Sequence, residues 1–174
     1  IKLAEERIEG YRNFCNKLWN ASRFVFMNLE GYQGTCKLDE HTEKSIADQW
    51  ILSRLNNTTQ EVNLALENFK FNDASLAVYK FIWNEYCDWY IEFAKPRLQE
   101  DGPGKIASQN VLVHVLEAAL KLLHPFMPFI TEEIWQKLPK NGDSIMVSAF
   151  PKFDVAKSDK DGEKAMGKVM EVIT

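Results

Sequence analysis

Cysteines and long apolar runs are scarce in this sequence, and both shortages exclude classes of protein. Its three cysteines, Cys15, Cys36 and Cys87, lie far apart, without the paired spacing of a zinc site or a disulfide framework. The longest apolar runs extend over only a few residues, so no transmembrane helix is predicted, and no signal peptide precedes the first amphipathic segment. We therefore expect reduced thiols and a cytoplasmic protein without a membrane partner.

An excess of positive charge is also missing. The chain has 21 basic and 25 acidic residues, a formal net charge of −4 and an isoelectric point near 5.5. This balance excludes a globally basic RNA-binding protein, although a local cationic patch can still attract a phosphate backbone. Any nucleic-acid site must therefore be explained by local residues.

The common catalytic motifs are absent as well. The sequence contains no glycine-rich dinucleotide loop after a strand, no His-Glu-x-x-His helix and no nucleophile elbow. Residues 99–105 are predicted to be a turn, because they follow a helix and lack the spacing of a phosphate-binding loop. His114 and His124 have no third ligand near them, so structural histidines are expected and no metal site. These absences favour recognition over catalysis.

Amphipathic helices dominate what is present. Hydrophobic residues make up 45% of the 174 and recur at helical spacing, which is enough for one domain with a sizeable core. Ser45 and Asp48 resemble a capping box, and Pro96 is expected to end the third helix. We predict an all-α bundle of about five long helices in residues 1–140, with helices at 2–29, 45–69, 73–95, 106–124 and 131–138.

The character of the chain changes after Lys140. Residues 144–150 contain a short β-branched run that Pro151 ends, which predicts a single strand. A last helix is expected to begin at Asp159 or Asp161. Because a lone strand needs a partner, residues 141–174 are interpreted as a truncated strand–helix junction toward a missing C-terminal region. The chain looks cut from a longer protein.

No acid occurs between Tyr11 and Leu29, and a helix of ~3.6 residues per turn divides this stretch into two sides. The apolar side consists of Tyr11, Phe14, Cys15, Leu18, Ser22, Val25, Phe26 and Leu29. The other side carries cations, amides and one aromatic that the core does not need: Arg12, Asn13, Asn16, Lys17, Asn20, Arg23 and Phe24. Two interpretations remain open, a nucleic-acid-binding face and an ordinary solvated face.

Aromatic residues point all round the third predicted helix. They are Tyr79, Phe81, Trp83, Tyr86, Trp89, Tyr90 and Phe93. One interpretation is a central helix packed on several sides, with tyrosine hydroxyls reaching polar partners. The other is that Trp83, Tyr86 or Tyr90 lines a recess beside the first helix where a base stacks.

Four segments carry a resemblance to a known family. They are RNFCNKLWNASRF (12–24), DQWILSRLN (48–56), CDWYIEFAKP (87–96) and HPFMPFITEEIW (124–135). Together they resemble the anticodon-binding domain of valyl-tRNA synthetases, over residues 1–150. The last segment alone is similar to class I synthetases for several aliphatic amino acids, whereas the first and third favour the valine member.

The resemblance implies an α-helical bundle that holds the anticodon stem-loop of valine-specific tRNA. A catalytic domain of the same synthetase, absent from this chain, would activate valine with ATP and Mg and charge the tRNA. The family's ATP-binding signatures do not occur here. The fragment alone is therefore expected to have no cofactor and no catalytic activity.

The resemblance also implies roles for individual residues. The positions that match the family's anticodon-contacting helix are Lys17, Arg23 and Phe24, and Arg12, Asn16 and Asn20 share their face. Phe24 would stack on a base, Arg23 and the two amides would reach base edges, and Lys17 and Arg12 would contact phosphate. Further contacts are expected from Arg7, Trp83, Tyr86 and Tyr90. The competing hypothesis is a helical scaffold whose polar face docks a partner domain.

Overall fold

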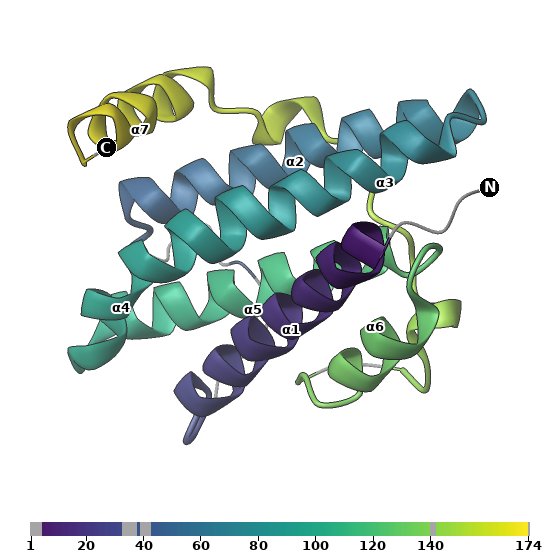
Figure 1. Ribbon diagram of the computed structural model, residues 1–174. Coiled ribbons are helices and arrows are strands. Elements are labelled where there is room, and N and C mark those ends of the chain that lie inside the picture. Colours follow the sequence, from purple (N-terminus) through teal and green to yellow (C-terminus); the bar gives the residue numbers. More distant parts are fainter. Residues whose placement is uncertain (1–4, 33–37, 39–42, 140–141, 174) are drawn as a thin grey trace.

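Helices form the whole architecture of the described chain (Figure 1). The computed structural model describes residues 5–32, 38, 43–139 and 142–173. Its elements are α1 Glu5–Asn28, α2 Ile46–Glu67, α3 Phe71–Lys80, the π-helical η1 Phe81–Tyr90, α4 Ile91–Gln99, α5 Pro103–Leu123, α6 Pro128–Trp135, the 3-10 turns η2 Ile145–Val147 and η3 Val155–Lys157, and α7 Lys160–Ile173. The predicted all-α class is confirmed. The predicted loop at 31–44 falls mostly outside the described residues.

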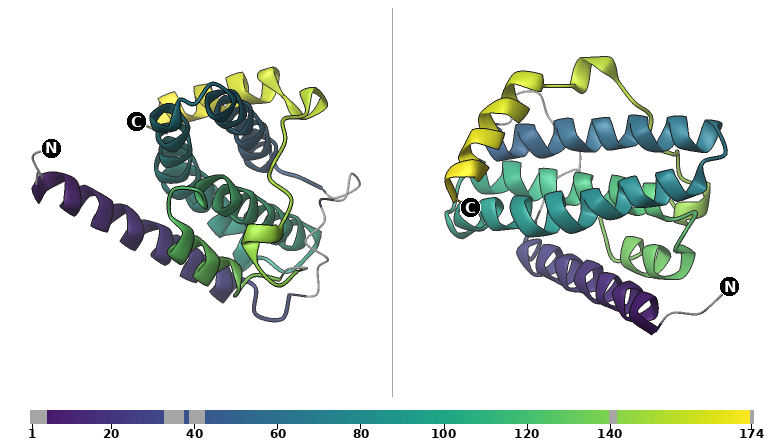
Figure 2. Two further views of the ribbon diagram at one scale, coloured as in Figure 1. Left: turned by 90° about the vertical axis from the view of Figure 1, so that its right-hand side faces the viewer. Right: turned by 45° about the horizontal axis from the view of Figure 1, so that its top comes forward.

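Three of these elements, α3, η1 and α4, follow one another without a break and form one long rod. The rod packs against α2 on one side and α5 on another, and α1 crosses η1 and α5 obliquely. Figure 2 shows the N-terminal half of α1 extending away from the bundle, while α6 lies beside α1 and α7 crosses α2. Helix α1 therefore presents one long side to solvent.

The rod explains the aromatic residues that surround the third helix. Tyr86 and Tyr90 are both fully buried. The Tyr86 hydroxyl donates to the Leu112 carbonyl of α5 at 3.1 Å, and the Tyr90 hydroxyl donates to Asp48 of α2 at 2.7 Å. The interpretation as a central helix packed on several sides is confirmed.

A buried carboxylate fixes the start of α2. The predicted capping box is present: the Ser45 hydroxyl accepts from the Asp48 amide at 3.0 Å, and the Ser45 amide donates to Asp48 Oδ2 at 2.8 Å. Asp48 is 1% exposed and also lies 3.4 Å from the guanidinium of Arg97 in α4. One side chain thus caps α2 and ties it to both η1 and α4.

Pro96 does not end the rod, and that prediction is wrong. Helix α4 continues through Pro96 to Gln99. A proline inside a helix removes one backbone donor, which is unfavourable in isolation. Ala94 and Leu98 on either side are buried in the core, so tertiary packing holds the last turn in place.

The predicted strand at 144–150 is also wrong, because the segment makes no ladder within the described residues. Instead η2 is a single 3-10 turn in which only Ile145 is buried. The Glu132 carboxylate of α6 holds this turn, accepting from the Ser144 hydroxyl at 2.9 Å and from the Ile145 amide at 3.1 Å. The β-branched pattern had no partner strand to pair with.

An arginine of α2 links helix α7 to η1, and Ser53 and Asn57 of α2 also donate to Glu163 of α7. Arg54 of α2 contacts Glu85 of η1 at 2.9 Å and Glu163 of α7 at 3.1 Å. The hydrogen bond to Glu85 is the main reason why the pKa of Arg54 is raised. The C-terminal residues therefore pack on α2, and the predicted domain boundary at 140 stays a prediction since Lys140 and Asn141 are not described.

Helix α5 is the one described helix long and apolar enough to cross a membrane, with a mean hydropathy of 1.3 over its most apolar window. That window is 72% buried inside the bundle. Helix α5 is therefore the core helix on which α1, α4 and α6 pack.

We predict that Asp48→Ala lowers the free energy of unfolding by about 3 to 5 kcal/mol. The substitution leaves a buried tyrosine hydroxyl, a backbone amide and a guanidinium without their acceptor. Urea unfolding measures the loss. The matched control is Asp73→Ala, an exposed acid in the first turn of α3, which should cost less than about 1 kcal/mol. Equal losses in the two variants would contradict the role given to Asp48.

Candidate nucleic-acid interface

The solvent side of α1 carries an acid-free stripe of exposed residues, most of them polar. Phe14, Leu18 and Val25 bury the opposite side against η1 and α5. Tyr11, assigned to the apolar side from sequence, is exposed because the N-terminal half of α1 projects from the bundle. We name the following exposed residues the α1 stripe: Arg12, Asn16, Trp19, Asn20, Arg23 and Met27.

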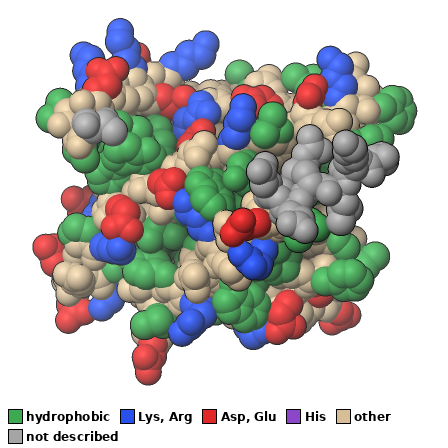
Figure 3. Space-filling view, in the orientation of Figure 1, with side chains coloured by type: hydrophobic (Ala, Val, Ile, Leu, Met, Phe, Trp, Pro, Cys, Tyr) green, Lys and Arg blue, Asp and Glu red, His purple; other side chains and the backbone are tan. Residues whose placement is uncertain are grey.

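Cations on this side of the molecule do not merge into one field. Figure 3 shows basic and acidic side chains interspersed over the face on which α1 lies. Arg12 contacts Glu9 at 3.2 Å, but both side chains are about two-thirds exposed, so the pair is weak and Arg12 stays accessible. Arg23 is exposed and has no hydrogen-bond or ion-pair partner among the described residues. It is therefore the freest cation of the stripe.

Lys17 lies beside the stripe, at the junction with η1. Its ammonium is 2.5 Å from Asp88 and 3.9 Å from the centre of the Trp83 ring. A cation over an indole face and next to a carboxylate is held by both. A phosphate contact by Lys17 would require exchange of Asp88, so that assignment stays a prediction.

Trp83 is packed against protein side chains, whereas the recess hypothesis requires a ring face that is open to a base. Its ring stacks with Tyr79 at 5.8 Å and with Phe14 at 6.4 Å, and Lys17 covers it. Tyr86 and Tyr90 are fully buried, so neither offers a ring to a base, and their inclusion as contact residues is wrong. The sequence pattern cannot distinguish a recess from a core that closes on the same rings.

Phe24 lies about two turns further along α1 than Lys17, on the same side of the helix. Its ring is partly buried against the core, and the Lys95 ammonium of α4 lies 6.0 Å from its centre. Lys95 is itself paired with Glu92 at 2.6 Å. An aromatic edge with a cation, Lys95, close by suits a base next to a phosphate.

Trp19 was missed in the sequence interpretation. It lies on the other flank of the stripe, 37% exposed, and the Lys137 ammonium near α6 is 5.3 Å from its ring. Its helical position, seven residues after Arg12 and four before Arg23, was the available signal. The side chain of Arg7 lies outside the described residues, so its predicted contact is not placed.

The thiol of Cys87 lies behind the junction of α1 and η1. Burial raises its pKa to about 12, Asp88 contributes in the same direction, and Lys17 opposes the shift. Within the described residues, no group of three or more His, Cys, Asp or Glu side chains is placed to hold a metal ion. His124 instead shares a hydrogen bond with Thr131 at 2.7 Å, as expected of a structural histidine.

One solved structure contains a region with a similar fold. The ternary complex of Agrobacterium radiobacter K84 agnB2 LeuRS with tRNA and LeuAMS contains a region similar to this chain, with a TM-score of 0.68 at 19% identity. The match covers 91% of this chain and 18% of that one. At this identity the likeness concerns the fold.

Sequence comparison defines the family. The profile of the anticodon-binding domain of tRNA ligases matches residues 48–174. The chain therefore belongs to the family of anticodon-binding domains of tRNA ligases.

Three similar curated proteins are all valine–tRNA ligases. The chain is 53% identical to a valine–tRNA ligase of Geobacter sulfurreducens over 99% of its length and 49% identical to one of Carboxydothermus hydrogenoformans over 97%. A third, from Thermotoga maritima, is 47% identical over 99%. The chain spans about a fifth of the length of these relatives.

We predict that Cys87 resists alkylation in the native protein at pH 8. With a pKa of about 12, its thiolate fraction is roughly a thousandfold below that of a free cysteine. Iodoacetamide labelling followed by peptide mass mapping measures the rate at each cysteine separately. In urea, Cys87 should label at the ordinary rate. Equal labelling of Cys87 in native and unfolded protein would contradict the burial of this thiol.

Proposed function

We propose that this chain is the anticodon-recognition part of a valine–tRNA ligase. The observation that carries the proposal is the α1 stripe, an exposed acid-free helix face on a domain of the anticodon-binding family. Bases of an anticodon loop are unstacked, so they can turn outward to meet aromatic rings and base-edge donors. Such a loop fits a narrow stripe better than a duplex, which needs a broad cationic surface.

Residues of the stripe and two residues beside it, Lys17 and Phe24, have chemical roles in this proposal. Phe24 stacks on one base, which contributes about 1 to 3 kcal/mol. Arg23, Asn16 and Asn20 donate to base edges and distinguish one base from another. Arg12 contacts phosphate at the far end of the stripe, and Lys17 contacts it when released from Asp88.

The remaining steps belong to parts of the protein outside this chain. We infer a catalytic domain in cis that uses ATP and Mg to activate valine and transfers it to the tRNA, in the cytoplasm where translation takes place. This chain would supply no catalytic cofactor and no reacting group. Its contribution is selection of the tRNA before charging.

The decisive experiment is a titration of the chain with valine-specific tRNA and with a transcript altered only in its anticodon bases. We expect the altered transcript to bind at least about tenfold more weakly at moderate salt, because base-edge contacts are lost while phosphate contacts stay. Fluorescence anisotropy measures both affinities. Equal affinities would contradict base-specific recognition. Weak absolute affinity alone would not, because an isolated domain loses contacts made elsewhere.

Arg23→Ala and Phe24→Ala test the residues at the centre of the site. Phe24→Ala should weaken the binding of valine tRNA by about 1 to 3 kcal/mol, and Arg23→Ala should reduce the difference in affinity between valine tRNA and the transcript with the altered anticodon. Matched controls are Lys168→Ala on α7 and Phe71→Ala on α3, both exposed and far from α1 in the sequence. If the variants bind tRNA normally but associate more weakly with the catalytic part, the scaffold hypothesis is correct instead.

A further inference from the structure

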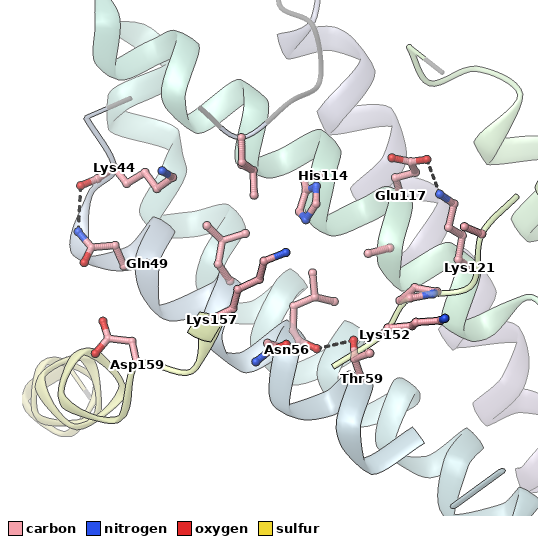
Figure 4. Close-up of a pocket in the computed structure, with 16 residues that line it drawn as sticks. Lys44, Gln49, Asn56, Thr59, His114, Glu117, Lys121, Lys152, Lys157 and Asp159 are labelled. Atoms are coloured by element: carbon pink, nitrogen blue, oxygen red, sulfur yellow. Dashed lines mark hydrogen bonds and ion pairs between the residues drawn. The ribbon is translucent and has the colours of Figure 1, made fainter. Parts of the chain in front are cut away.

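A cleft lies on residues that the anticodon proposal does not use. Its volume is about 910 Å³, and it is lined by α2, α5 and the segment that runs from residue 149 to the start of α7 (Figure 4). The apolar part of its lining, called the floor below, includes Leu52 and Leu55 of α2 and Ala118 of α5. This volume lies in the range of small-molecule binding sites. None of the lining residues belongs to α1 or η1.

The cleft is positively charged although the protein is acidic. Four lysines line it: Lys44, Lys121, Lys152 and Lys157. Figure 4 shows Lys157 extending beneath His114 toward the middle of the cleft. Within the described part of the chain, Lys152 has no hydrogen-bond or ion-pair partner, and Lys157 lies 4.0 Å from an exposed Asp154.

The two acids that line the cleft already have partners within the protein. Glu117 is held by Lys121 at 2.8 Å, one turn away on α5. The Asp159 carboxylate accepts from the Gly162 amide at 2.8 Å and so caps the start of α7. Neither neutralises Lys152 or Lys157, and the cleft keeps an excess of positive charge.

Amide side chains of α2 fix the wall that carries these two lysines. Asn56 donates to the Asp154 carbonyl at 2.8 Å and accepts from the Asp154 amide at 3.0 Å. Asn63 donates to the Pro151 carbonyl at 3.3 Å. The backbone is thus anchored next to Lys152 and a few residues before Lys157. The two ammonium groups are presented by a built wall.

The kinds of side chain define the class of ligand. All cations of the cleft are lysines, and lysine ammonium groups bind phosphate oxygens as compact point charges. The apolar floor suits a flat ring more than a bare polyanion or an RNA backbone. Burial lowers the pKa of His114, so its ring is a neutral donor or acceptor near neutral pH.

We propose that this cleft binds a nucleoside polyphosphate, with its phosphates between Lys44, Lys152 and Lys157 and its base over Leu52, Leu55 and Ala118. The site is independent of the α1 stripe. Its occupation would place a small phosphorylated ligand on the part of the chain where the C-terminal segment meets α2 and α5.

Isothermal titration of the 174-residue chain with ATP, tripolyphosphate and adenosine tests the proposal. ATP should bind more tightly than either partial ligand, because only ATP uses both the lysines and the floor. The variant K152E/K157E should lower the affinity for ATP by about tenfold or more, because two lysines that attract phosphate are replaced by acids that repel it. The control K164E/K168E alters the net charge equally on exposed lysines of α7 and should change ATP affinity by less than about twofold.

Failure takes recognisable forms. If ATP does not bind, or if both variants lose ATP affinity equally, the proposed site is wrong. If tripolyphosphate binds as tightly as ATP, the ligand does not need a nucleoside and that part of the proposal is wrong. If K152E/K157E weakens the binding of valine tRNA but not the binding of ATP, the cleft binds RNA and the proposal is wrong. Arg23→Ala should leave ATP affinity unchanged, so failure of the anticodon proposal is distinguishable from failure of this one.

Discussion

The buried carboxylate of Asp48 is the contact on which the arrangement of the bundle depends. It caps α2 and accepts from the Tyr90 hydroxyl of η1, with the Arg97 guanidinium of α4 3.4 Å away. A charge 1% exposed is unfavourable unless hydrogen bonds and an opposite charge compensate it, and here three elements supply them. Any other register of α2 against the rod would take the carboxylate away from the Tyr90 hydroxyl and the Arg97 guanidinium. Specificity of packing therefore follows from polar satisfaction, while apolar burial supplies the driving force.

The rod determines where α1 can lie and what α1 shows to solvent. Its π-helical segment turns Trp83 and Asp88 toward Lys17, and α4 brings Lys95 to Phe24. Lys17 and Phe24, which are expected to meet RNA, are thereby engaged with the protein, whereas Arg23 and the amides of the α1 stripe make no side-chain hydrogen bond or ion pair in the part of the chain that the structure describes. An interface assembled on a rigid helix over a closed core loses little freedom when it binds.

Charge is distributed locally across the molecule. The chain has a net charge of −4, yet Lys44, Lys152 and Lys157 gather beside α2, and α1 is acid-free from Tyr11 to Leu29. Acids elsewhere are used as caps and pair partners: Asp48, Glu85, Asp159 and Glu163 all hold helices in place. An acidic composition thus leaves room for local groups of cations at two separate places on the surface.

The sequence by itself determined the class of fold, the capping box at Ser45 and the polar side of α1, because helical periodicity and cap chemistry are local. It also indicated the family through four short segments. Only the tertiary structure decided that Tyr86 and Tyr90 are core, that the helix passes through Pro96 and that residues 145–147 form a turn instead of a strand. Trp19 on the stripe and the lysine cleft were likewise visible only in three dimensions. Burial, partner strands and cavities depend on residues far apart in the chain, which no local pattern records.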